Sequence, residues 1–200
     1  SFGGTAFIGG NQAVTESYNG TSWSFGGKMI TARQSLMGAG TTTAALSFGG
    51  STGSIVGNTE SYNGTSWSSG GSLSTVVQYA GGCGTNTAAL CAGGAPTGST
   101  YSTTTQIYNG TSWSTGGSLS VAKSQLAACG ISTAALAWGG NGTASYVNTE
   151  SYNGTSWSTG GNLATARWYL AGAGTTTSAL AFGGSNGTIL ANTESYNGTS

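Results

Sequence analysis

Residues able to carry out chemistry are few in this sequence of 200 residues. Its acidic side chains are Glu16, Glu60, Glu150 and Glu194, and it contains neither aspartate nor histidine. Hydrolysis of a glycosidic bond needs two carboxyl groups that flank one substrate. A Ser-His-Asp triad needs two residue types that are missing here. The sequence therefore predicts a protein that is not an enzyme.

The cysteines and glycine-rich turns suggest no other chemistry. Cys83, Cys91 and Cys129 are not spaced as metal ligands, and no histidine is present to join them. They stand where other repeats carry small residues, so we expect buried, inert thiols. The turn at 40–43 lacks the lysine and the helix of a phosphate-binding loop. No metal or organic cofactor is expected.

Charge and hydropathy narrow the choice of partners. Charged residues make up 4% of the chain, four basic against four acidic, so the net charge is zero. A neutral surface does not attract nucleic acid or an anionic membrane. No apolar run approaches the roughly 20 residues of a transmembrane helix. The 36% of hydrophobic residues suffices for a core despite 38 glycines. We expect a folded domain with neither nucleic acid nor membrane as a partner.

A repeated unit underlies the whole chain. The phrase Tyr-Asn-Gly-Thr-Ser-Trp begins at Tyr18, Tyr62, Tyr108 and Tyr152, and begins again at Tyr196 without its tryptophan. A Gly-Gly pair ends an apolar run 27 residues after each tryptophan, as from Trp23 to Gly50. The step from Gly-Gly to the next tryptophan is 17 or 19 residues. A period of 44 or 46 residues with one variable loop is typical of propeller blades.

Each repeat predicts four short strands and no helix. In the second repeat we expect strands at 36–40, 44–48, 59–62 and 65–67, with a tight turn at 41–43. Asn63-Gly64 is a strong hairpin signal because both residues tolerate positive φ. Four such strands cannot bury both faces alone, so the blades must stack radially. The expected fold class is all-β, with about 4.5 four-stranded antiparallel blades in a single repeat domain over 1–200.

The ends of the chain are equivalent parts of the repeat. We expect complete blades at 34–68, 78–114 and 124–158, a partial blade at 1–24, and at 168–200 a blade without its fourth strand. Stretches 1–22 and 181–200 duplicate each other, so four ordinary blades would not close a ring. Either the array continues in a longer polypeptide, or copies self-associate and the strand around Trp23 completes a partner's last blade.

The spacing of these elements resembles the kelch family. An apolar strand ends in Gly49-Gly50, a variable loop follows, Tyr62 stands five residues before Trp67, and a basic residue opens most blades. The resemblance implies a kelch-like β-propeller over the whole chain. Some kelch-like proteins are copper oxidases, but their histidine ligands have no counterpart here. The Tyr-Asn-Gly-Thr-Ser-Trp phrase is also similar to kelch-type repeats of marine bacteriophage structural proteins, which implies an extracellular or virion location.

Comparison between repeats predicts three ion pairs. Three of the four acids lie 27 residues after a basic residue, in the pairs Arg33–Glu60, Lys123–Glu150 and Arg167–Glu194. In the repeat that has Val77 in place of the basic residue, the acid is replaced by Gln106. Such co-substitution favours a clamp within each blade over catalytic carboxylates.

Variation between repeats concentrates at one face. The loops after Gly-Gly differ, as do the residues just after the basic position: Ser35, Tyr79, Gln125 and Tyr169. In an up-and-down blade both sites emerge on the same face, and such variation on a rigid scaffold is typical of binding proteins. Aromatic residues there that could stack on sugar rings are Tyr79, Tyr101, Tyr146, Trp168 and Tyr169. The sequence favours recognition of a glycan or host receptor; the alternative is an architectural or engineered scaffold without a ligand.

Overall fold

The structure, a computed structural model, describes residues 1–6 and 10–199. Residues 7–9 of the first variable loop and Ser200 of the expected last blade lie outside the described residues. The described residues form β-strands and no helix, and all pairings between these strands are antiparallel. The all-β expectation is confirmed.

Three sheets are complete four-stranded blades, with strands adjacent in chain order. The first consists of β5 (Met37–Thr41), β6 (Ala44–Phe48), β7 (Thr59–Tyr62) and β8 (Trp67–Gly70). The second consists of β9 (Gly81–Gly84), β10 (Ala89–Ala92), β11 (Thr105–Tyr108) and β12 (Trp113–Thr115). The third consists of β13 (Ala127–Ile131), β14 (Ala134–Trp138), β15 (Thr149–Tyr152) and β16 (Trp157–Thr159).

The two ends of the chain form incomplete sheets. The C-terminal sheet has the three strands β17 (Ala171–Gly174), β18 (Ala179–Phe182) and β19 (Thr193–Tyr196). The N-terminal repeat supplies the pair β3 (Glu16–Tyr18) and β4 (Trp23–Phe25), and the small hairpin β1 (Thr5–Ala6) and β2 (Gly10–Asn11).

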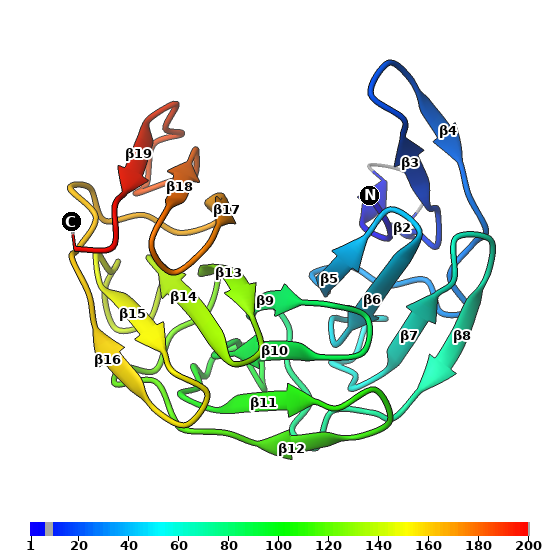
Figure 1. Cartoon of the computed structure of the whole chain (residues 1–200), viewed down its shortest axis with the longest axis horizontal. Coiled ribbons are helices and arrows are strands. Elements are labelled where there is room, and N and C mark those ends of the chain that lie inside the picture. The colour runs from blue at the N-terminus through cyan, green and yellow to red at the C-terminus, as the bar shows by residue number, and fades with distance from the viewer. Residues whose placement is uncertain (7–9, 200) are drawn as a thin grey trace.

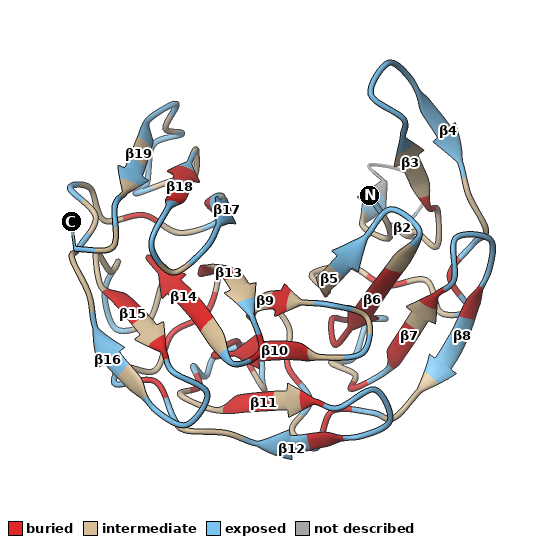
Figure 2. Ribbon diagram, in the orientation of Figure 1, coloured by how far each residue is buried: buried red, intermediate tan, exposed pale blue. Residues whose placement is uncertain are grey.

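The blades form an open arc of a propeller ring (Figure 1). Their innermost strands contact one another in the order β5, β9, β13 and β17. The pair β3–β4 and the sheet β17–β19 stand at opposite ends of the arc. Burial follows from this arrangement, because β10 is buried along its whole length while β4 at the end of the arc is exposed throughout (Figure 2).

The strand limits differ from the expectation at the turns. The strands expected at 44–48 and 59–62 are present as β6 and β7. The expected fourth strand is present as β8, but it begins at Trp67 and not at residue 65, and β5 lies one residue later than the expected 36–40. The Asn63 side-chain oxygen accepts the backbone N–H groups of Thr65 (3.0 Å) and Ser66 (2.9 Å). Asn63 thus closes a four-residue turn by its side chain, and only Gly64 takes positive φ there (93°).

Neighbouring blades pack through a large ring set over a glycine. A Cβ atom added to Gly82 of β9 would lie 2.9 Å from Cζ of Phe48 in the preceding blade. Two further glycines are covered by a ring of the preceding blade in the same way: Gly38 by Phe2 and Gly172 by Trp138. Where the preceding blade carries the small Ala92, the glycine is replaced by Ala128. The glycine in the first strand therefore makes room for the ring of its neighbour.

Gly82→Ala should lower the free energy of unfolding by about 1–3 kcal/mol, because the new methyl group overlaps Phe48. The matched change Ala128→Gly removes a methyl group opposite Ala92 and should cost no more than about 1 kcal/mol. Urea titration of both variants checks this. Equal losses for the two would contradict a steric role for the ring.

Candidate functional site

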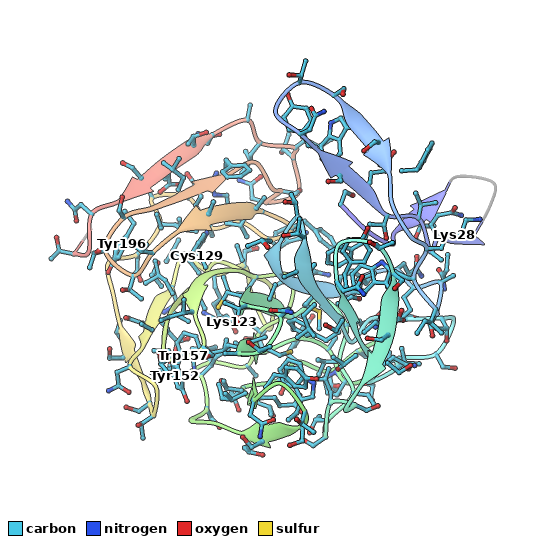
Figure 3. The ribbon with its side chains drawn as sticks, turned by 45° about the vertical axis from the view of Figure 1, so that its right-hand side comes forward. Lys28, Lys123, Cys129, Tyr152, Trp157 and Tyr196 are labelled. Atoms are coloured by element: carbon cyan, nitrogen blue, oxygen red, sulfur yellow. The ribbon has the colours of Figure 1, made fainter. Side chains whose placement is uncertain are left out.

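The three expected ion pairs are present inside the blades. The N···O distances are 2.9 Å for Arg33–Glu60, 3.1 Å for Lys123–Glu150 and 2.9 Å for Arg167–Glu194. All three basic side chains are fully buried, and Figure 3 labels Lys123 in the interior and Lys28 at the rim. Burial lowers the pKa of Lys123 below its ordinary value, and Glu150 counteracts this shift. Each of these three carboxylates is bound to a cation of its own repeat, as a structural clamp requires.

Each clamp also fastens the linker between blades. Glu60 accepts the backbone N–H groups of Ile30 (2.6 Å) and Thr31 (3.2 Å), at the approach to its own blade. In the uncharged blade Gln106 does the same for Thr75, accepting its N–H at 3.0 Å and donating to its carbonyl at 2.9 Å. Val77 fills the place of the cation and is fully buried. An amide with an apolar neighbour therefore replaces the ion pair.

The three thiols lie in the buried clusters between the blades. The three cysteines are free and buried, and burial raises the pKa of Cys83 to about 12 and that of Cys129 to about 11. Within residues 1–6 and 10–199 no group of three or more cysteine or acidic residues could hold a metal ion. In the same residues no helix has the length and apolarity to cross a membrane.

The variable residues after the basic position form a ladder across the blades. The backbone N–H of Tyr79 donates to Ser35 (3.1 Å), that of Gln125 to Tyr79 (2.6 Å), and that of Tyr169 to Gln125 (3.0 Å). These four residues have left-handed backbones, with φ between 54° and 57°. This conformation costs a residue with a Cβ about 1–3 kcal/mol, and strain of this kind clusters at functional sites. The ladder directly precedes the innermost strands β5, β9, β13 and β17, and these strands line the concave side of the arc (Figure 1).

Two of the predicted ligand residues meet on this ladder. The rings of Tyr79 and Tyr169 lie 5.6 Å apart between centroids, edge to face at 75°. The side-chain N–H of Gln125 donates to the Tyr169 hydroxyl at 2.9 Å. The Tyr169 ring is 54% exposed, and partial burial together with Tyr79 raises the pKa of its hydroxyl. The pair therefore has one exposed ring, that of Tyr169, while Tyr79 is partly buried and the Gln125 amide is turned toward the Tyr169 hydroxyl.

The other predicted ligand residues lie apart from the tyrosine pair. Tyr101 is 37% exposed in the loop between β10 and β11. Tyr146 lies in the loop between β14 and β15 and hydrogen-bonds Thr143 at 3.2 Å. Trp168 is partly buried, and its backbone pairs with Ser185. Among the described residues none of the three shares a hydrogen bond or ring contact with the pair, so the structure narrows the candidate site to Tyr79, Gln125 and Tyr169.

One set of structural partners was not predicted from the sequence. In three places the threonine before a repeat's acid or glutamine accepts the indole N–H of the next blade, as Thr59 does from Trp113 at 2.9 Å. This threonine recurs at Thr15, Thr59, Thr105, Thr149 and Thr193. The recurrence of this threonine in every repeat could have indicated a structural role. Nothing local in the sequence, however, indicates that its hydroxyl accepts a hydrogen bond from an indole in another blade.

Comparison with known proteins supports the fold. The solved structure of YjhT superposes with a TM-score of 0.77 over 97% of this chain and 76% of YjhT. The fold is a β-propeller. Sequence identity to YjhT is 13%, so this likeness shows the architecture alone. No family model and no curated protein matches the chain.

Proposed function

We propose that this propeller is a non-enzymatic recognition module that binds a neutral glycan at Tyr79, Gln125 and Tyr169. The observation that carries the proposal is the convergence of two aromatic rings, from blades that are not adjacent in the chain, on one strained ladder where Tyr169 is exposed. Aromatic rings stack on the apolar faces of sugars, and hydroxyl and amide groups accept and donate hydrogen bonds to sugar hydroxyls.

The charges favour a neutral ligand. Arg33, Lys123 and Arg167 are buried and paired within their blades. Lys28, the remaining basic side chain, is exposed in the linker after the incomplete first blade. A sialylated or sulfated glycan would need a cation to replace its hydration. Neutral hexoses of a host surface suit the site better.

The kelch-like repeats suggest the setting. Together with the phrase shared with marine bacteriophage structural proteins, they support a place on a phage fibre or another extracellular surface, where the glycan would be a host receptor. The competing proposal is an architectural or engineered scaffold without a ligand. The hydrogen bond from Gln125 to the Tyr169 hydroxyl supports the scaffold without a ligand, because these two polar groups already have each other as partners.

A neutral-glycan array followed by calorimetry tests the proposal. We expect retention of at least one neutral glycan and a loss of at least about tenfold in affinity, or 1.4 kcal/mol, for Tyr169→Ala. Tyr101→Ala, an exposed aromatic on an outer loop, is the matched control and should change affinity less than about twofold. No retained glycan would favour the scaffold. Equal losses of affinity for Tyr169→Ala and Tyr101→Ala would contradict a site at the tyrosine pair and would indicate binding at the outer loops.

A further inference from the structure

The tripeptide Asn-Gly-Thr occurs in two structural settings in this chain. It forms the turn between the third and fourth strands of a repeat at Asn19, Asn63, Asn109 and Asn153, and it stands in the loop between the second and third strands at Asn141 and Asn186. The backbone nitrogen that follows an asparagine can attack the side-chain amide, and glycine hinders this attack least because it has no side chain. Since the three residues are the same in both settings, the two settings differ in the geometry that the fold imposes on them.

In the hairpin turns two backbone N–H groups bind the side-chain oxygen of the asparagine. Asn63 accepts the N–H groups of Thr65 at 3.0 Å and Ser66 at 2.9 Å. The equivalent bonds to Asn109 and Asn153 measure 2.9–3.0 Å. The glycine that follows each of these asparagines donates its N–H to no described residue, and all residues of the three turns are exposed. The amide is therefore fixed and polarised, while the nitrogen next to it is free.

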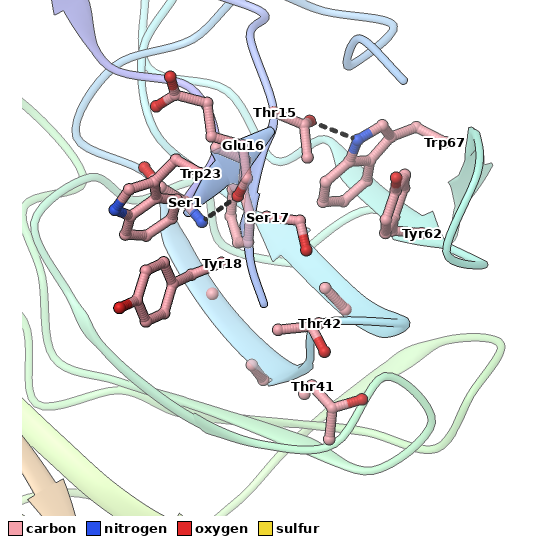
Figure 4. Close-up of a pocket in the computed structure, with 15 residues that line it drawn as sticks. Ser1, Thr15, Glu16, Ser17, Tyr18, Trp23, Thr41, Thr42, Tyr62 and Trp67 are labelled. Carbon is pink, nitrogen blue, oxygen red and sulfur yellow. Dashed lines mark hydrogen bonds between the residues drawn. The ribbon is translucent and has the colours of Figure 1, made fainter. Parts of the chain in front are cut away.

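The packing of the hairpin holds the turn in this geometry. The backbone N–H of Asn63 donates to the Ser66 carbonyl at 3.2 Å, which closes the turn. The rings of Tyr62 and Trp67, the residues on either side of the turn, lie 5.0 Å apart. The Trp67 indole in turn donates to Thr15 at 2.8 Å, as Figure 4 shows. The N–H groups around the Asn63 oxygen are thus in place before any reaction begins.

In the loops the glycine N–H is occupied and the asparagine oxygen has fewer donors. Gly142 donates to the Ala144 carbonyl at 3.0 Å, and Gly187 donates to the Ser185 hydroxyl at 3.1 Å. The Asn141 side chain accepts no backbone N–H from the described residues. The side chain before Gly187 accepts one, at 3.2 Å. Attack by the glycine nitrogen would first break its own hydrogen bond, so the loops protect the same tripeptide.

We propose that the hairpin asparagines Asn63, Asn109 and Asn153 are sites at which the folded chain modifies itself by deamidation. In the first of these turns the backbone nitrogen of Gly64 gives its proton to a base in the solvent and bonds to Cγ of Asn63. The tetrahedral carbon that results carries its negative charge on Oδ1, where the two N–H groups stabilise it as an oxyanion hole does. The bond from Cγ to the side-chain nitrogen then breaks, and ammonia leaves with a proton from the solvent. A succinimide ring remains.

Hydrolysis of the succinimide adds a negative charge to the turn. Water that breaks the bond between the glycine nitrogen and Cγ yields aspartate, and water that opens the other carbonyl yields isoaspartate, whose backbone runs through the side chain. Each event replaces a neutral amide with a carboxylate in a chain of zero net charge. A Cβ atom on Gly64 would lie 3.3 Å from the Thr43 carbonyl, so the turn lies beside the turn after β5. The ladder precedes β5, so the modified turns are at the opposite ends of the strands from Tyr79 and Tyr169.

Peptide mapping by mass spectrometry during incubation of the 200-residue chain at neutral pH tests this proposal. We expect aspartate and isoaspartate to form at Asn63, Asn109 and Asn153 at least about tenfold faster than at Asn141 and Asn186. The same chain unfolded in guanidinium chloride is the control, and there the five rates should be roughly equal. Loop asparagines that react as fast as hairpin asparagines in the folded chain would overturn the proposal. A preference for the hairpin sites that persists in guanidinium would also overturn it, because neighbouring sequence would then be the cause.

Ser185→Ala separates the free nitrogen from the oxyanion hole. The variant removes the acceptor of the Gly187 N–H and should speed deamidation of Asn186 about 2- to 10-fold, with no change at Asn63. The rate at Asn186 should stay below that at Asn63, because a single N–H binds its side-chain oxygen. An unchanged rate at Asn186 would contradict the protection assigned to the glycine hydrogen bond. A rate equal to that at Asn63 would contradict the oxyanion hole.

Discussion

Glu150→Ala is expected to lower the free energy of unfolding by about 3–5 kcal/mol, because it leaves Lys123 buried and uncompensated. Lys123 has less support than the arginines at the same position. Arg33 also donates to the carbonyls of Gly49 (2.7 Å) and Asn58 (2.8 Å). The Lys123 ammonium meets only the ion-pair distance to Glu150, without hydrogen-bond geometry to any described residue. Urea unfolding monitored by tryptophan fluorescence measures the loss.

The chain supplies its own control for that experiment. Lys123→Val combined with Glu150→Gln copies Val77 and Gln106, a combination that the fold already accommodates. The double variant should lower the free energy of unfolding by about 1 kcal/mol or less, although it changes two residues where Glu150→Ala changes one. A double variant as unstable as Glu150→Ala would show that the pair stabilises the blade beyond neutralising its own charges.

The loss in Glu150→Ala should also depend on pH. Burial lowers the pKa of Lys123, and the variant removes the carboxylate that opposes this shift. The unfolded chain then binds a proton that the folded chain binds weakly, so stability rises as the pH increases toward the ordinary lysine value of 10.5. The difference between Glu150→Ala and the parent should therefore shrink between neutral pH and pH 10. A constant difference would mean that the charge of Lys123 is not its cause.

Trp113→Ala is expected to have the second large effect, a loss of about 3–5 kcal/mol in the free energy of unfolding. Trp113 is 8% exposed, packs against Phe48 at 4.9 Å and donates to Thr59 at 2.9 Å, so the variant leaves a cavity and an unpaired hydroxyl. These contacts join two complete blades in the middle of the arc.

Trp157→Ala is the matched comparison for Trp113→Ala. Trp157 keeps the bond to its threonine, Thr105, at 2.9 Å, but it faces Ala92 where Trp113 faces Phe48. Its replacement should therefore cost less, by about the 0.5–1.5 kcal/mol of an aromatic pair. Thermal unfolding of both variants orders them. A larger loss for Trp157→Ala would contradict the role assigned to the ring of the preceding blade.

Much of this fold was predictable from the sequence. Local rules place strands at 44–48 and 59–62, and the repeats align every blade with the others, so that co-substitution at Val77 and Gln106 indicates a contact between residues 29 positions apart. The turn at Asn63 was misjudged because the side chain, rather than a second positive φ, closes it. That choice depends on a local hydrogen bond that residue preferences do not distinguish.

The sequence by itself determined the features that recur along the chain: the four-stranded unit, the ion-pair clamp of three repeats, and a composition without histidine or aspartate. Only the tertiary structure decided what differs between them. Trp23 and Trp113 share one motif, yet one is exposed and the other buried, because each indole is covered by the preceding blade. Likewise Tyr79 and Tyr169 meet because backbone hydrogen bonds between successive blades align equivalent positions in one ladder. Position in the arc is set by contacts between blades, and these join residues that no local pattern relates.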